Sequence, residues 1–364
     1  MKKKKFNILS LADNKKEMKS LRKFLKGLKR TYIWKFFIQY FFYPFYNFFW
    51  KYFLNFKAKF LYILWSTKKK DFVNLSKKTA VVITDNEVFK DLSKKISSES
   101  NLLIEKGKEK ILSAEYKKKL FDALGPSSVD AELPYRTDLY DYLSDNLKRE
   151  IVKFASSEMM ISTAAKYMGI FPMLTRVQVG LNIPRQNASR RGAMHWHRDT
   201  FGFKNLDFFM AVTDVDDESA PFEYLEKKIK ASAFLTFQNL LSTTKGGERG
   251  KVSPEEFSKH FKDNEISKFA GKSGSAIFVD TFSTYHRGGF CKSKDRVLFR
   301  LTYQSHDAIY TQLSFMNNYN IDKILKKNEI NNIFKKYLFK KKSKFMEIIS
   351  GRILNFYRKL DFII

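Results

Sequence analysis

Cysteine and histidine are scarce in this 364-residue chain, which contains one cysteine and five histidines. The single cysteine, Cys291, excludes an intramolecular disulfide and is typical of a protein from a reducing compartment. The opening residues MKKKK are followed by the polar stretch SLADNKKEMKS, where a secretory signal would need an apolar segment. We therefore expect a cytoplasmic protein without a disulfide framework.

Acidic residues are scarce at both ends of the chain. Residues 1–70 contain 19 lysines and arginines against 2 acids, residues 315–364 contain 12 against 4, and residues 71–314 are nearly balanced at 37 against 32. Such a basic surplus suits anionic lipid head groups or nucleic acid phosphates, although an AT-rich genome would also produce an excess of lysine. The basic residues are not interleaved with a recognisable recognition fold, so we do not expect nucleic acid as a partner.

Residues 36–50, FFIQYFFYPFYNFFW, form an uncharged aromatic run that is too short to cross a membrane. The run has fifteen residues, a spanning helix needs roughly 18 to 20, and Pro44 interrupts the run. Its aromatic composition suits the membrane–water interface. Residues 1–70 are therefore predicted to be a basic, aromatic-rich extension. Three arrangements remain open: an anchor on an anionic membrane surface, a helical hairpin packed on the protein's own domain, and insertion into the bilayer.

The spacing of apolar residues divides the middle of the chain into a helical part and a strand-rich part. Residues 71–170 show mainly helical spacing, as in TDLYDYLSDNLKREIVKFASSEMM, with one strand expected at TAVVIT. Residues 171–305 contain short β-rich runs between Gly, Pro, Asp, Asn or Lys breaks: LTRVQVGLNI, DFFMAVTDV, ASAFLTF, SGSAIFVDTF and RVLFRLTYQ. This pattern is typical of an antiparallel sandwich or barrel. We therefore predict one α+β domain over residues 71–305.

The last segment, residues 306–364, returns to helical spacing. One face of the predicted helix is apolar, with lysines opposite, and contains Ile330, Ile333, Phe334, Tyr337 and Leu338. We therefore expect a basic amphipathic helical tail after the domain, as a counterpart to the basic N-terminal extension.

Two histidines lie just ahead of an aspartate in the stretch GAMHWHRDTFGF. His197 and Asp199 are separated by one residue, so both side chains would lie on the same face of an extended strand. One short segment would thus offer a metal both an imidazole and a carboxylate. His286 follows 87 residues after Asp199, at a predicted strand end in FVDTFSTYHRGG. Two histidines and one carboxylate with open remaining positions form the facial triad of non-haem iron(II) oxygenases.

The strand RVLFRLTYQ follows the distal histidine and separates its residues onto two faces. Arg296, Leu298, Arg300 and Thr302 share one face, and the alternating apolar residues share the other, which is predicted to lie under helices. The first face offers a guanidinium for a bidentate contact with a carboxylate. A bare H-x-D pattern arises often by chance. Here H-x-D is followed by a distant His at a strand end and then by an Arg on the next strand, and this order indicates a functional site.

Two stretches resemble the phytanoyl-CoA dioxygenase-like proteins. WHRDTFGFKNLDFFMAVTDVDDESAPFEYL resembles the family's metal-binding region, and SGSAIFVDTFSTYHRGG with RVLFRLTY resembles its distal-histidine region. The resemblance covers roughly residues 170–305. It implies a double-stranded β-helix (jelly-roll, cupin-like) barrel with a helical layer, and Fe(II) and 2-oxoglutarate as cofactors.

The same resemblance assigns roles to individual residues. It implies that His197, Asp199 and His286 are the catalytic iron ligands. Arg296, ten residues after His286, would bind the distal carboxylate of 2-oxoglutarate, and Arg300 is the second candidate.

The resemblance also implies an activity and leaves an alternative. The family's reaction uses O2, hydroxylates a substrate and converts 2-oxoglutarate to succinate and CO2. Asp199 favours hydroxylation, because a small residue there would open a position for halide. We expect a small-molecule or lipid-like substrate, and His195 and Trp196 are candidates for contacting it or for orienting a ligand. The alternative is a non-catalytic metal-binding jelly-roll protein tethered to a membrane by its basic termini.

The sequence departs from the family's pattern at two places. Ala220-Pro221 stands where the family usually has Gly-Pro after an acidic turn, and EKKIKASAF replaces a Gly-Ser-His stretch. These departures concern the identity of the substrate more than the metal ligands.

Overall fold

The computed structural model describes residues 43–66, 71–75, 78–118, 135–184, 192–199, 204–229, 252, 254–306 and 338. Residues 51–341 belong to one compact unit. Residues 1–50 and 342–364 belong to a second unit, of which only residues 43–50 are described. The expected strand ASAFLTF, most of the N-terminal extension and the tail other than His306 and Leu338 lie outside the described residues.

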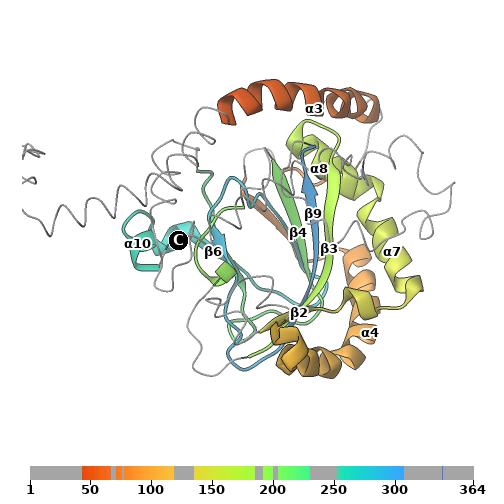
Figure 1. Cartoon of the computed structure of the whole chain (residues 1–364), viewed down its shortest axis with the longest axis vertical. Coiled ribbons are helices and arrows are strands. Elements are labelled where there is room, and N and C mark those ends of the chain that lie inside the picture. Colours follow the sequence, from red (N-terminus) through yellow and green to blue (C-terminus); the bar gives the residue numbers. More distant parts are fainter. Residues whose placement is uncertain are drawn as a thin grey trace, which may run out of the picture. The chain divides into compact units, whose positions relative to one another are not determined.

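Two antiparallel sheets form the framework of the compact unit (Figure 1). One has six strands in the order β1-β7-β4-β9-β3-β2, and the other has three in the order β6-β5-β8. The strands are β1 Ala80–Ile83, β2 Arg136–Asp138, β3 Met173–Asn182, β4 Asn205–Ala211, β5 Phe222–Leu225, β6 Ile266–Phe269, β7 Ala276–Val279, β8 His286–Arg287 and β9 Arg296–Gln304. An isolated bridge between His197 and His286 adds residue 197 beside β8.

The described α-helices are α3 Tyr43–Ser66, α4 Glu87–Leu112, α7 Asp145–Ala155, α8 Glu158–Met168 and the short α10 Pro254–Ser258. Local sequence sets their ends. The side chain of Asn86 accepts a hydrogen bond from the Phe89 amide at the start of α4. Gly169 ends α8 in the left-handed conformation that glycine adopts at little cost. Pro44 lies in the first turn of α3, where its missing amide is not needed, so the aromatic run continues into a helix there.

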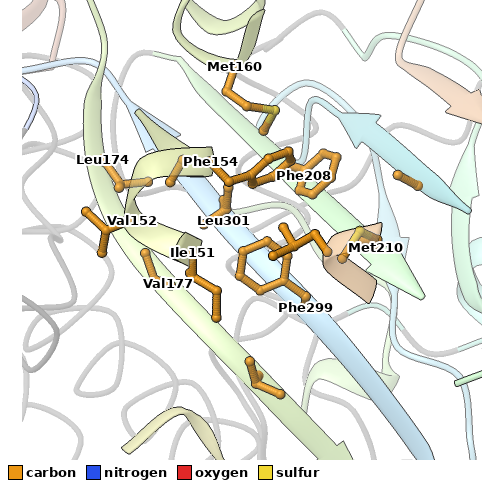
Figure 2. Packing of buried hydrophobic residues seen from close by; sticks show 14 of the residues in the cluster. Ile151, Val152, Phe154, Met160, Leu174, Val177, Phe208, Met210, Phe299 and Leu301 are labelled. Carbon is orange, nitrogen blue, oxygen red and sulfur yellow. The ribbon is translucent and has the colours of Figure 1, made fainter. Parts of the chain in front are cut away.

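The main core lies between the helices and the six-stranded sheet (Figure 2). Phe154 of α7 contacts Phe208 of β4 and Phe299 of β9, with ring centroids 5.6 Å and 6.2 Å apart. The apolar face of β9 belongs to this cluster and contains Val297, Phe299, Leu301 and Tyr303. The predicted placement of that face under helices is therefore confirmed. The opposite face of β9, with both arginines, lines a cavity.

The mixture of helices and antiparallel sheet that the sequence predicted is present. Strands were expected and found at β1, β3, β4, β7 and β9, whereas β2, β5, β6 and β8 were not anticipated. The four unanticipated strands have two to four residues each, which is too short for an alternating pattern to stand out. None of the described helices, α3 included, combines the length and hydropathy needed to span a membrane.

Candidate metal centre

Three candidate ligands lie together at the edge of the smaller sheet: His197 and Asp199 from one short segment, and His286 from 87 residues further along the chain. The His197 amide donates to the His286 carbonyl at 3.0 Å, and the His286 amide donates to the His197 carbonyl at 2.9 Å. This reciprocal pair places the two imidazoles side by side, with ring centroids 4.3 Å apart. The Asp199 amide donates to the Thr281 carbonyl at 2.9 Å, which fixes the third side chain next to them.

The three side chains have the geometry and burial of a metal site. His197 Nε2 lies 3.9 Å from Asp199 Oδ1, and His286 Nε2 lies 3.9 Å from Asp199 Oδ2. Two atoms bonded to one ion at about 2.1 Å are separated by roughly 3 to 4.2 Å, depending on the angle between the bonds. Asp199 and His286 are buried. The donor set and its spacing therefore fit a divalent transition-metal ion.

Main-chain carbonyls orient both imidazoles. His197 Nδ1 lies 2.8 Å from the His195 carbonyl, and His286 Nδ1 lies 3.4 Å from the Thr284 carbonyl. With the proton on Nδ1 in each ring, the Nε2 lone pair is left for a metal. Burial lowers the pKa of His286, which favours the neutral form that a metal ligand requires.

A buried carboxylate supports the centre from the six-stranded sheet. Asp207 of β4 is fully buried. It accepts hydrogen bonds from the side chains of Asn205, Thr281, Arg300 and Thr302. These donors satisfy both of its oxygens, which is what a buried charge requires. Asp207 was not anticipated from the sequence, although a carboxylate inside the apolar run NLDFFMA was an available signal.

The two candidate arginines have different surroundings. Arg300 Nε donates to Asp207 Oδ1 at 2.9 Å, and Arg300 Nη2 lies 3.4 Å from Asp199 Oδ2. Arg300 thus links the buried carboxylate to the candidate metal ligand. Arg296 is also buried, and its Nη1 donates to the Ala220 carbonyl. Its Nε has no hydrogen-bond partner among the described residues, whereas the Nε of Arg300 is paired with Asp207.

One cavity of about 140 Å³ joins these groups. Its lining includes the three candidate ligands and the two arginines, together with Gln178, Asn182, Phe209, Phe222 and Leu298. The candidate metal centre and Arg296 therefore line the same cavity.

Ala220 occupies a backbone conformation that favours glycine. Its φ is 64°, the one positive φ of a non-glycine residue in the described part of the chain. Gly289 packs against it so closely that a Cβ there would lie 2.4 Å from the Ala220 carbonyl carbon. The departure from Gly-Pro thus puts an alanine in a glycine conformation, and the carbonyl of this residue still binds Arg296.

His195 and Trp196 lie beside the centre without lining the cavity. The His195 main-chain carbonyl contacts His197 Nδ1. Trp196 is buried and stacks on Phe257 with ring centroids 4.1 Å apart, while the Arg287 guanidinium lies 4.3 Å from its ring centroid. The structure thus places the Trp196 side chain in a separate apolar cluster. The predicted contact of these two side chains with a substrate remains a prediction.

No protein-family model and no curated protein matches the sequence. Low similarity exists to apo EctD from S. alaskensis, at 13% identity over 65% of this chain and 75% of that chain, with a TM-score of 0.40. The alpha-ketoglutarate-dependent epimerase SnoN from nogalamycin biosynthesis is 13% identical over 64% of this chain and 78% of that chain, with a TM-score of 0.36. EvdO2 from Micromonospora carbonacea var. aurantiaca, complexed with 2-oxoglutarate, is 12% identical over 65% of this chain and 93% of that chain, with a TM-score of 0.37. Similarity at this level assigns no function, which has to be inferred from the chain's own residues.

Proposed function

We propose that the chain is an Fe(II)- and 2-oxoglutarate-dependent dioxygenase that hydroxylates a small-molecule or lipid-like substrate. One observation carries the proposal: half-buried His197 and buried Asp199 and His286 share a cavity with Arg296, whose Nε has no partner among the described residues. The donor set fits iron, and the arginine fits a carboxylate of 2-oxoglutarate.

The strand order supports this assignment. We infer a double-stranded β-helix made from β3, the residues at the His197 bridge, β4, β5, β6, β7, β8 and β9. The larger sheet contributes β3, β4, β7 and β9, and the smaller sheet contributes the other four segments. Eight antiparallel segments shared between two sheets in this way are the arrangement of a jelly roll. The candidate ligands lie on the smaller sheet and its edge, and the two arginines face them from the larger sheet.

The side chains have separate roles in this proposal. His197 and His286 would bind the iron through Nε2, and Asp199 would bind it through its carboxylate. Arg296 would hold the distal carboxylate of 2-oxoglutarate. When bound, iron and 2-oxoglutarate supply the oxidising chemistry that hydroxylates the substrate and yields succinate and CO2. Arg300 would hold Asp199 in place through its own pairing with Asp207.

A non-catalytic metal-binding jelly-roll protein is the alternative. Such a protein would bind a metal with the same three ligands but would not need Arg296 to bind a carboxylate. The two possibilities therefore differ in whether 2-oxoglutarate binds next to the metal. This difference can be measured without knowing the substrate.

The test is anaerobic addition of Fe(II) and then 2-oxoglutarate to the full chain, followed by exposure to O2. The dioxygenase proposal expects a weak visible absorption band that appears only when iron and 2-oxoglutarate are both present, and slow succinate formation after O2 is admitted. Asp199→Ala is the matched negative control, because it removes one ligand. Iron binding without the band and without succinate would favour the non-catalytic alternative.

A further inference from the structure

The C-terminal half of helix α3 has apolar side chains on two opposite sides. Its inner side packs on the domain. Ala58 and Leu61 are 0% and 5% exposed, and the Trp65 indole donates to the Ser162 hydroxyl at 2.9 Å. The Phe171 amide donates to the Ala58 carbonyl at 2.9 Å. These contacts fix the helix on the domain, so the opposite side of the helix faces away from it.

The opposite side, here called the outer face of α3, contains Phe56, Phe60, Ile63 and Leu64. Their exposed fractions are 71%, 58%, 53% and 48%. Steps of four, three and one residue place them in a single stripe along the helix. A helix that packs on a domain with one side normally has polar residues on the other. A contiguous apolar stripe there indicates a surface that a partner covers.

Two lysines border the outer face. Lys57 and Lys59 are both exposed. At 3.6 residues per turn they lie on opposite sides of the stripe formed by Phe56, Phe60 and Ile63. Lysines in this position can place their ammonium groups among anionic head groups while aromatic residues enter the interface. Residues 55–66 contain no acid, and the whole chain has a net charge of +30.

From these observations we propose that the outer face of α3 docks on the surface of an anionic membrane. The helix would lie along the interface, since it lacks the length and hydropathy to cross it. A second copy of the chain is a poorer occupant, because pairing two outer faces would bring Lys57 and Lys59 of both copies together. The proposal is independent of the dioxygenase assignment, as it uses none of the residues around the cavity.

The test is flotation of the full chain with vesicles of phosphatidylcholine containing 30 mol% phosphatidylserine, compared with pure phosphatidylcholine. Binding should favour the anionic vesicles and weaken between 50 and 500 mM NaCl. Phe60→Glu should lower the partition coefficient by about ten-fold or more, because it puts a charge into the apolar stripe. Phe60→Trp should retain binding.

Leu102→Glu is the matched control, since Leu102 is 79% exposed on α4, outside the proposed surface. This variant should bind vesicles as the unchanged chain does. If Phe60→Glu binds the anionic vesicles as strongly as the unchanged chain does, the proposal is overturned, and binding is due to the basic ends alone. Absence of binding by the unchanged chain would also overturn it, and a concentration-dependent dimer lost in Phe60→Glu would identify a second copy as the occupant. Iron binding, measured on the same samples, reports separately on the metal centre.

Discussion

Replacing each cavity arginine by alanine should produce two different defects. Arg296→Ala should weaken 2-oxoglutarate binding while iron binding stays near normal, because Arg296 contacts none of the three candidate ligands. Arg300→Ala should instead weaken iron binding and destabilise the fold, because Arg300 bridges Asp207 and Asp199. The two residues lie on the same face of β9, so the pair is a matched comparison within one strand.

The expected loss of 2-oxoglutarate affinity and the expected loss of stability follow from the partners of each arginine. Removing one partner of a buried charge-assisted pair costs about 2 to 5 kcal/mol, which corresponds to roughly 30-fold to 5,000-fold weaker 2-oxoglutarate binding for Arg296→Ala. Arg300→Ala leaves the fully buried Asp207 without its counter-ion. Loss of one partner of a buried ion pair typically lowers the free energy of unfolding by about 3 to 5 kcal/mol.

Calorimetric titration of 2-oxoglutarate into the Mn(II)-loaded protein measures the first effect, and urea unfolding of the metal-free protein measures the second. Asp207→Asn added to Arg300→Ala is the internal control. It removes the uncompensated charge and should restore a large part of the lost stability. The reasoning is refuted if Arg300→Ala impairs 2-oxoglutarate binding more than Arg296→Ala at equal metal occupancy.

Three further outcomes are expected. Ala220→Gly should raise the free energy of unfolding by about 1 kcal/mol, because φ of 64° strains alanine but not glycine, and an unchanged urea midpoint would contradict this. Gly289→Ala should lower the melting temperature, because its Cβ would lie 2.4 Å from the Ala220 carbonyl carbon; an unshifted thermal transition would count against the close packing. Burial lowers the pKa of His286 from 6.5, so the unfolded chain takes up a proton at this residue at a higher pH than the folded chain does. This residue should therefore make the free energy of unfolding fall as pH drops below about 6.5. Urea titrations should show a weaker dependence of that free energy on pH in His286→Gln.

The sequence predicted the site best where a residue motif lay on an extended segment, because side chains there alternate between two faces. H-x-D on an extended segment placed His197 and Asp199 on one side, and the alternation in RVLFRLTYQ correctly separated the core face of β9 from the cavity face. The mutual approach of His197 and His286 depends on a bridge between segments far apart in the chain. No local pattern encodes that bridge, so only the order of motifs indicated it.

Other features of the site depend on tertiary contacts that local patterns do not reveal. The alternation in RVLFRLTYQ does not by itself distinguish Arg296 from Arg300. Their different surroundings arise from Asp207 on a neighbouring strand and from the Ala220 carbonyl. Likewise, Trp196 lies in the motif next to His197, yet it packs against Phe257 because alternate residues of an extended segment point to opposite sides. The side chains of Trp196 and His197 therefore have different surroundings, although the two residues are neighbours in sequence.

The most direct test of the proposed metal centre is the iron content of four purified variants, His195→Ala, His197→Ala, Asp199→Ala and His286→Ala, with succinate formation measured on the same samples. The three ligand variants should lose iron and all succinate formation while remaining folded. His195→Ala should keep iron and part of the turnover, because the His195 contact to His197 is made by its main-chain carbonyl. Iron retained by Asp199→Ala, or lost from His195→Ala as completely as from His197→Ala, would contradict the ligand set.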